Sequence, residues 1–226
     1  MADIVGRARD DTTMDLTELT ADLRIELDAR MAARERGLTE SRKAIRSCGN
    51  AIRALHRHEV GGALRLLEEA QTQVDEARRV LADFPDVLHA GFVHDAEKEL
   101  AEARITFALV SGAGIPSHKR LGVPAIAYLK GMAEAIGELR RHILDLMRRG
   151  ELRRGEELLE AMDDMYYLLT SMDYPDGLTL GLRRLTDVAR SIIERTRGDF
   201  TVSVVQGSLR RALEDHATRL DDDTGA

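Results

Sequence analysis

Four glutamates in the middle of the chain have the residue type and the spacing to hold a divalent metal ion. Glu99 and Glu102 lie three residues apart in KELAEA, and Glu134 and Glu138 lie four residues apart in YLKGMAEAIGELRR. Residues at these spacings share one face of an α-helix, where like charges weaken the helix by roughly a few tenths of a kcal/mol. Carboxylate oxygens are the ligands that Mg²⁺ prefers. The pattern therefore indicates that something compensates this repulsion, and a metal ion is one candidate.

Simpler explanations of the same carboxylates stay open on these residues alone. Glu99 and Glu102 border the apolar stripe of their predicted helix, so they can form a solvated acidic edge beside Lys98. The other two glutamates can pair with the basic residues around them, which are Lys130, Arg141 and His142.

The face that carries Glu134 and Glu138 has almost no side-chain bulk in the preceding turns. Ala127 and Gly131 occupy that face. Small residues let another backbone or a ligand come close. A pair of glutamates beside such a gap favours the binding of a hard cation.

A row of arginines occupies one face of an earlier predicted helix, in ESRKAIRSCGNAIRALHRHE. Arg42, Arg46, Arg53 and Arg57 fall within about 60° of one another on a helical wheel, with apolar residues opposite. Guanidinium groups in a row can follow the phosphates of a nucleic acid. They can equally pair with acidic helices of a neighbouring subunit, and the sequence does not separate these two interpretations.

The composition is that of a folded, charge-rich, helical protein. The chain has 226 residues, of which 43% are hydrophobic and 32% charged, with no tryptophan and four prolines. Ala, Leu, Arg and Glu dominate, which favours helices. The net charge of −7 argues against a uniformly basic nucleic-acid coat, although a local arginine row can act within an acidic protein. We expect an all-α fold.

One cysteine excludes an internal disulfide and a multi-cysteine zinc site. The polar, acidic start of the sequence does not resemble a signal peptide, and no apolar run approaches the roughly 20 residues of a membrane span. The short motifs of zinc proteases, P-loop proteins and serine hydrolases are also missing from the sequence. We expect a cytoplasmic protein without a membrane partner.

The spacing of apolar residues and helix-breaking residues predicts about seven helices in one bundle domain, 15–216. Tails at 1–14 and 217–226 are expected to be flexible, and the second of them is acidic. Glycines at 61–62 and 198 and the segments DFPD and SMDYPDG are expected to separate helices. The predicted helices are 15–57, 63–82, 87–111, 124–149, 151–170, 178–197 and 201–216.

With these features in view, the chain resembles the translin family, and within it the branch of translin-associated factor X (TRAX) and its archaeal relatives. The resemblance runs from about residue 30 to 215. It is carried by SRKAIRSCGNAIRALHRHE, KELAEA, YLKGMAEAIGELRR and SMDYPDGLTLGLRRLTDVARSIIERTR, in this order. The pattern YLxGxxExxxEL, followed by a helix and the D-Y-P-D loop, is its most specific part.

The resemblance implies a seven-helix fold that assembles into closed barrels, commonly octamers, with RNA or single-stranded DNA inside. It also implies that TRAX-like subunits carry an acidic, Mg²⁺-dependent (or Mn²⁺-dependent) endoribonuclease site, which maps onto Glu99, Glu102, Glu134 and Glu138. Where TRAX enzymes have Asp, this chain has the longer Glu134, whereas translin proper has an apolar residue there. The acid therefore places the chain with the catalytic branch.

The leading hypothesis is a metal-dependent endoribonuclease that cleaves single-stranded RNA or small RNA duplexes inside a homo-oligomeric barrel, with an octamer expected. Arg42, Arg46, Arg53 and Arg57 would then contact phosphates without reading sequence. The alternative is a catalytically silent protein that binds RNA or single-stranded DNA, in which the glutamates are structural. A helical adaptor without nucleic acid is a third hypothesis, and a translin-like partner subunit is a further candidate partner.

Overall fold

The computed structural model describes the backbone of residues 15–224 and the side chains of residues 15–219. Every regular element in this range is a helix, so the all-α prediction is confirmed. The tail predicted at 1–14 lies outside the described residues. The helices are α1 (Leu16–His56), α2 (Val60–Val80), α3 (Pro85–Leu88), α4 (Phe92–Val110), α5 (His118–Leu121), α6 (Ala125–Arg149), α7 (Leu152–Thr170), α8 (Asp176–Thr179) and α9 (Leu182–Thr224).

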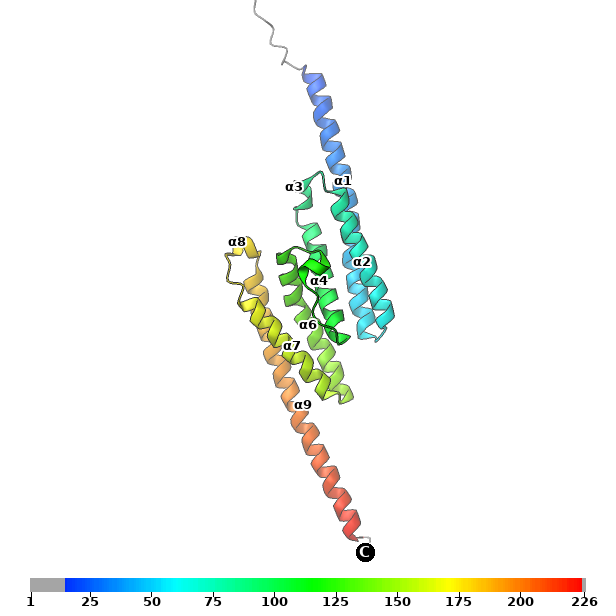
Figure 1. Cartoon of the computed structure of the whole chain (residues 1–226), viewed down its shortest axis with the longest axis vertical. Coiled ribbons are helices and arrows are strands. Elements are labelled where there is room, and N and C mark those ends of the chain that lie inside the picture. Colours follow the sequence, from blue (N-terminus) through cyan, green and yellow to red (C-terminus); the bar gives the residue numbers. More distant parts are fainter. Residues whose placement is uncertain (1–14, 225–226) are drawn as a thin grey trace, which may run out of the picture.

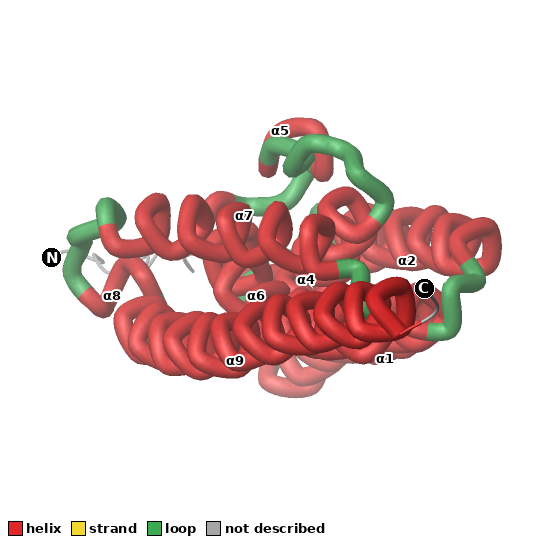
Figure 2. Tube along the Cα trace, turned by 90° about the horizontal axis from the view of Figure 1, so that it is seen from below, coloured by secondary structure: helices red, strands yellow, loops and turns green. Residues whose placement is uncertain are grey.

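The long helices lie side by side in an elongated bundle whose centre is the pair α4 and α6 (Figures 1 and 2). Helix α4 packs against α1 and α2 on one side, and α6 packs against α7 and α9 on the other. One apolar core fills each half: fully buried Cys48, Leu67 and Leu100 belong to the first, and Ile136 and Met162 to the second. The two central helices are therefore held from both sides, which gives side chains at their contact a fixed position.

The chain reverses between α1 and α2 without the predicted glycine turn. His58 adopts a left-handed conformation with φ of 62°, and the Glu59 backbone N–H donates to the carbonyl of Ala54. Helix α2 then begins at Val60, so both glycines of the pair 61–62 lie in its first turn. The predicted start at residue 63 is wrong because the turn is made three residues earlier.

The predicted helix 87–111 is divided in two. The single-turn α3 begins at Pro85, and Gly91, with φ of 103°, ends that segment before α4 begins at Phe92. Glycine adopts this conformation without the steric cost that a Cβ atom would add.

The two helices predicted at 178–197 and 201–216 are one continuous helix, α9, which follows the single-turn α8 and passes through Gly198 to Thr224. Gly198 is exposed within α9, and an internal glycine costs only about 1 kcal/mol in a helix, which a long helix tolerates. The predicted break at Gly198 is therefore wrong, and the helix also includes most of the predicted tail 217–226. The described residues contain six long helices and three of a single turn.

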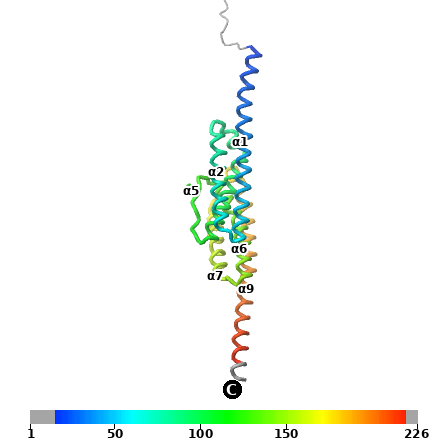
Figure 3. Tube along the Cα trace, turned by 90° about the vertical axis from the view of Figure 1, so that its right-hand side faces the viewer, coloured from blue at the N-terminus to red at the C-terminus, as the bar shows by residue number. Residues whose placement is uncertain are grey.

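The first part of α1 and the last part of α9 extend beyond the bundle at opposite ends (Figures 1 and 3). Both carry exposed apolar side chains, among them Leu23 and Ile25 on α1 and Val205 and Leu209 on α9. None of the helices within residues 15–224 is both long and apolar enough to cross a membrane.

Candidate functional site

Helices α4 and α6 come into backbone contact at Gly131. A Cβ atom at this position would lie 2.5 Å from the carbonyl oxygen of Lys98 and 2.8 Å from the backbone nitrogen of Glu102. Ala127, one turn earlier on the same face, is fully buried. The small face that the sequence predicts for a backbone or a ligand is therefore occupied by the backbone of α4. This contact brings the acidic residues of both helices together.

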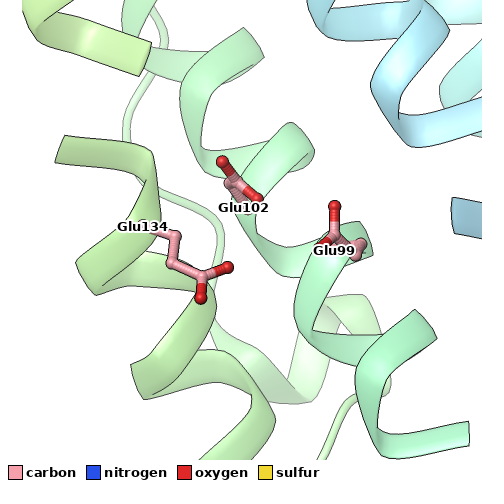
Figure 4. Close-up of side chains that lie close together, drawn as sticks. All are labelled: Glu99, Glu102 and Glu134. Atoms are coloured by element: carbon pink, nitrogen blue, oxygen red, sulfur yellow. The ribbon is translucent and has the colours of Figure 1, made fainter. Parts of the chain in front are cut away.

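Three of the four predicted glutamates converge across this contact. Glu99 and Glu102 project from α4 and Glu134 from α6, and one ligand oxygen from each lies within 4.8 Å of the others (Figure 4). The side chains of Glu99 and Glu134 keep 26% and 30% of their surface exposed. We call these three residues the acidic triad. It is half-buried, so water and a ligand can still reach its oxygens.

The acidic triad resists a third negative charge. Burial, followed by the charges of Glu99, Glu134 and Glu138, raises the pKa of Glu102 to about 8. The raised pKa favours the protonated form of Glu102 at neutral pH. A divalent cation would reverse this preference, because metal binding requires the deprotonated carboxylate.

The ammonium group of Lys98 lies among the triad carboxylates. Its Nζ donates a hydrogen bond to Glu134 and lies 3.1 Å from an oxygen of Glu99. Burial alone would lower the pKa of Lys98, but the hydrogen bond to Glu134 and the nearby negative charges raise it overall. Lys98 is thus a charged partner of two triad members.

Glu138, the fourth predicted residue, has a different partner. Its carboxylate accepts a hydrogen bond of 2.6 Å from Nε2 of His56, whose side chain is only 5% exposed. This hydrogen bond is the main reason why the pKa of Glu138 is lowered. Burial and the neighbouring His56, Arg149 and His58 lower the pKa of His142 to about 4, so the His142 imidazole is neutral at neutral pH. Glu138 lies beside the triad and contributes charge to it, but the structure does not include it in the converging oxygens.

The donor set of the acidic triad fits a hard divalent cation. All three ligands are carboxylates, and neither nitrogen nor sulfur belongs to the group, which favours Mg²⁺ or Mn²⁺ over zinc or copper. Cations of this class bind oxygen at about 2.0–2.6 Å, so opposite ligands are roughly 4 to 5 Å apart. The oxygens lie within 4.8 Å of one another, which does not exceed that span, and rotation of side chains that are partly exposed can bring them closer.

All four predicted arginines are exposed: Arg42, Arg46 and Arg53 lie on α1, and Arg57 directly follows its last residue. Arg53 donates to Asn50, and Arg57 pairs with Glu59, while Arg42 and Arg46 have no ion-pair partner among the described residues. The opposite face of α1 is buried against α2 and α4. The arginine row and the acidic triad therefore lie on different sides of α1.

The buried face of α1 places Cys48 near the acidic triad. Burial, together with the charges of Glu99 and Glu102, raises the pKa of this thiol to about 12. Cys48 therefore remains protonated and does not act as a nucleophile.

The sequence analysis named Lys98 only as the basic residue beside a solvated acidic edge, and it did not identify His56 as a member of the site. Lys98 directly precedes Glu99, and that adjacency was the available signal. His56 belongs to α1 and reaches Glu138 of α6 only through the tertiary fold. No spacing in the sequence predicts that contact.

Known proteins share both the sequence pattern and the fold. No known family profile matches the chain. An uncharacterised protein of Methanocaldococcus jannaschii is 31% identical over 185 residues, which cover 81% of this chain and 82% of that protein. The solved structure of AfC3PO has a TM-score of 0.75 and 31% identity, and the complex of AfC3PO with duplex RNA has a TM-score of 0.73 and 32% identity. Each match covers 83% of this chain and 97% of the AfC3PO chain.

NeC3PO without ligand has a TM-score of 0.75 over 84% of this chain and 99% of its own, at 18% identity, which shows a shared fold. AfC3PO and NeC3PO are C3PO proteins of the translin and TRAX group. The identity to AfC3PO, the common all-α bundle and the ordered motifs on α1, α4 and α6 lead to the same conclusion. The chain belongs to the translin family.

Proposed function

We propose that this protein is a metal-dependent endoribonuclease that cleaves single-stranded RNA or small RNA duplexes inside a homo-oligomeric barrel. The observation that carries this proposal is the convergence of Glu99, Glu102 and Glu134 from two helices. Their all-oxygen donor set and partial exposure suit a Mg²⁺ or Mn²⁺ ion that must also meet a substrate.

Each carboxylate has a role that follows from its position. Glu99 projects from α4 and Glu134 from α6, so these two carboxylates would hold the cation from both helices. Glu102, the member with the raised pKa, would complete the ligand set once it loses its proton. Glu138, fixed by His56, would keep the local field negative. A bound Mg²⁺ would supply activation of a water molecule and neutralisation of charge on the phosphate.

The RNA part of the proposal is supported by similarity and by charge. AfC3PO, which is 32% identical, has been solved with duplex RNA. The exposed arginine row supplies groups that can contact phosphates. The same row could serve single-stranded DNA, because phosphate contacts do not depend on the sugar.

Assembly is supported by two features of the single chain. The projecting ends of α1 and α9 expose apolar side chains that a partner subunit would cover. In addition, the arginine row and the acidic triad lie on different sides of α1, so a second copy can bring one copy's arginines near another's carboxylates. We propose a homo-octamer by analogy with the family, and light scattering that shows only a monomer would contradict the barrel.

Cleavage of a labelled single-stranded RNA tests the proposed activity. We expect cutting with Mg²⁺ or Mn²⁺, none with EDTA, and a loss of about 100-fold or more in Glu134→Gln, because one triad ligand loses its charge. Glu138→Ala should also lose cleavage, since it removes the partner of buried His56. Both variants should keep oligomer size and RNA affinity. Cleavage that persists in Glu134→Gln would show that the acidic triad is not the active site.

One observation favours the silent alternative. Lys98 already pairs with Glu99 and Glu134, as in a site where the glutamates serve structure alone. In that case the protein would bind the same RNA tightly and in a salt-sensitive way but would not cut it with any divalent metal. The cleavage experiment therefore separates the two functions.

If the arginine row contacts RNA phosphates, the affinity for RNA should depend on salt concentration through these residues. Each phosphate contact contributes about 0.7 to the slope of log affinity against log salt for single strands. The double variant Arg42→Gln and Arg46→Gln should therefore lower the magnitude of this slope by about 1.4 per subunit that contacts RNA. Arg153, exposed on α7 outside the row, provides the control Arg153→Gln, which should leave the slope unchanged. Equal slopes in the double variant and the wild type would remove the row from the RNA interface.

A further inference from the structure

Lys98 is a cation that the chain itself supplies to the acidic triad. Its ammonium group pairs with Glu134 on α6 and with Glu99 on α4, and its side chain is only 16% exposed. It thus lies at the contact between the helices. Two of the three converging carboxylates already share this positive charge.

The position of Lys98 is fixed by the close contact at Gly131. The carbonyl oxygen of Lys98 is the atom that a Cβ added at Gly131 would meet first, so the side chain of Lys98 starts at the point where the two helices touch. From there its four-carbon side chain reaches Glu134, one turn further along α6. A surface lysine with a free choice of rotamers would lose side-chain entropy by ordering here, and the ion pairs must outweigh that loss.

A divalent ion and this ammonium group would compete for the same oxygens. Lys98 uses lone pairs of Glu99 and Glu134, which are two of the three ligands of the candidate metal centre. A second positive charge within a few ångströms of a bound divalent ion is strongly unfavourable at the low effective dielectric of a half-buried site. This repulsion favours departure of the ammonium group when the ion enters.

We infer that Lys98 is a tethered counter-ion of the acidic triad, which holds Glu99 and Glu134 together in the metal-free protein and is displaced when a divalent cation binds. This inference rests on the proposed function, because it assumes that the triad is the metal centre. Lys98 would keep the carboxylates in place between turnovers. It would also weaken the affinity of the acidic triad for a metal ion, so that only an ion with a higher charge than the ammonium group would bind.

The test is Mn²⁺ binding without RNA, measured by titration calorimetry on the full-length protein. Lys98→Met should bind Mn²⁺ at least about tenfold more tightly than the wild type, because a competing charge is lost. Lys98→Arg keeps the charge and should stay much closer to the wild type. Lys130, on α6 beside Gly131, has no ion-pair partner among the described residues, so Lys130→Met is a matched control that removes the same charge and should change affinity little.

A thermal-unfolding series on the same proteins gives a second readout. In EDTA, Lys98→Met should unfold at a lower temperature than the wild type, since its carboxylates repel one another without a counter-ion. Saturating Mn²⁺ should raise the unfolding temperature of Lys98→Met by more than it raises that of the wild type. If the role of Lys98 were purely structural, the Lys98→Met variant would have both a lower unfolding temperature and a lower affinity for Mn²⁺ than the wild type. A lower unfolding temperature in EDTA together with a higher Mn²⁺ affinity therefore distinguishes a displaced counter-ion from a purely structural lysine.

The outcomes separate the inference from the proposed function. Equal or weaker Mn²⁺ binding by Lys98→Met, with normal binding by the wild type, would overturn the inference and leave the metal centre intact. Failure of every variant to bind Mn²⁺ would overturn both. Binding by Lys98→Met alone would overturn the inference, because the native lysine would then block the site instead of giving way to the ion, as the silent alternative requires.

Discussion

Gly131→Ala is expected to destabilise the protein by about 2–4 kcal/mol and to disrupt the acidic triad. In an ordinary helix interior the same change stabilises by about 1 kcal/mol, because alanine has the higher helix propensity. Here the added methyl group would lie 2.5 Å from the Lys98 carbonyl oxygen and 2.8 Å from the Glu102 backbone nitrogen. These are backbone atoms of α4, so the clash can be relieved only by separating two helices that are packed from both sides.

Gly137→Ala provides the control on the same helix. A Cβ at Gly137 would meet only a terminal carbon of Ile192, at 4.0 Å, so this variant should be as stable as the wild type or more stable. Urea denaturation of both variants measures the difference. Folded Gly131→Ala should also bind Mn²⁺ more weakly, since Glu134 is moved away from Glu99 and Glu102. Equal stability of the two alanine variants would contradict the close contact of α4 and α6.

The site could be predicted from sequence as far as its chemistry follows from local spacing. Pairs at three and four residues place Glu99 beside Glu102 and Glu134 beside Glu138 on their helices, and the small face at Gly131 indicates a close approach. The resemblance to the translin family then predicts that the two pairs form one acidic site. Which oxygens converge depends on the rotation of α6 against α4, and that rotation selects Glu134 for the triad and leaves Glu138 to His56.

The fold shows the same division between local and tertiary information. Helices α1, α6 and α7 begin and end within about two residues of their predicted bounds, because caps and breakers act locally. Gly198 was predicted to break a helix, but the cost of one exposed glycine is small beside the packing that holds the first part of α9 against α6 and α7. The turn was predicted at the glycine pair 61–62, but it lies at His58, which takes a left-handed conformation that is uncommon for residues other than glycine.

Glu102→Gln is expected to make the metal-free protein more stable than the wild type, by a margin that grows as the pH rises. The pKa of Glu102 is about 8 in the folded state, whereas its ordinary value, which applies to the unfolded chain, is 4.5. Between these values the folded state holds a proton that the unfolded state has lost. Wild-type stability therefore falls across this range, by at most about 1.4 kcal/mol per pH unit. Glutamine has no proton to lose and avoids this decrease. Urea denaturation in EDTA at several pH values between about 5 and 8 measures the margin.

Glu138→Gln is the control of opposite sign, because its carboxylate has a lowered pKa owing to the hydrogen bond from His56. The stabilisation from that ionised group is present above its unfolded pKa and is lost as the pH falls through the folded value, so this variant should be less stable than the wild type at neutral pH. Saturating Mn²⁺ should reverse the order for Glu102→Gln, since the metal stabilises the ionised carboxylate that only the wild type provides. A margin for Glu102→Gln that stays constant with pH would show that Glu102 is already ionised in the metal-free protein. The acidic triad would then bind a cation without releasing a proton.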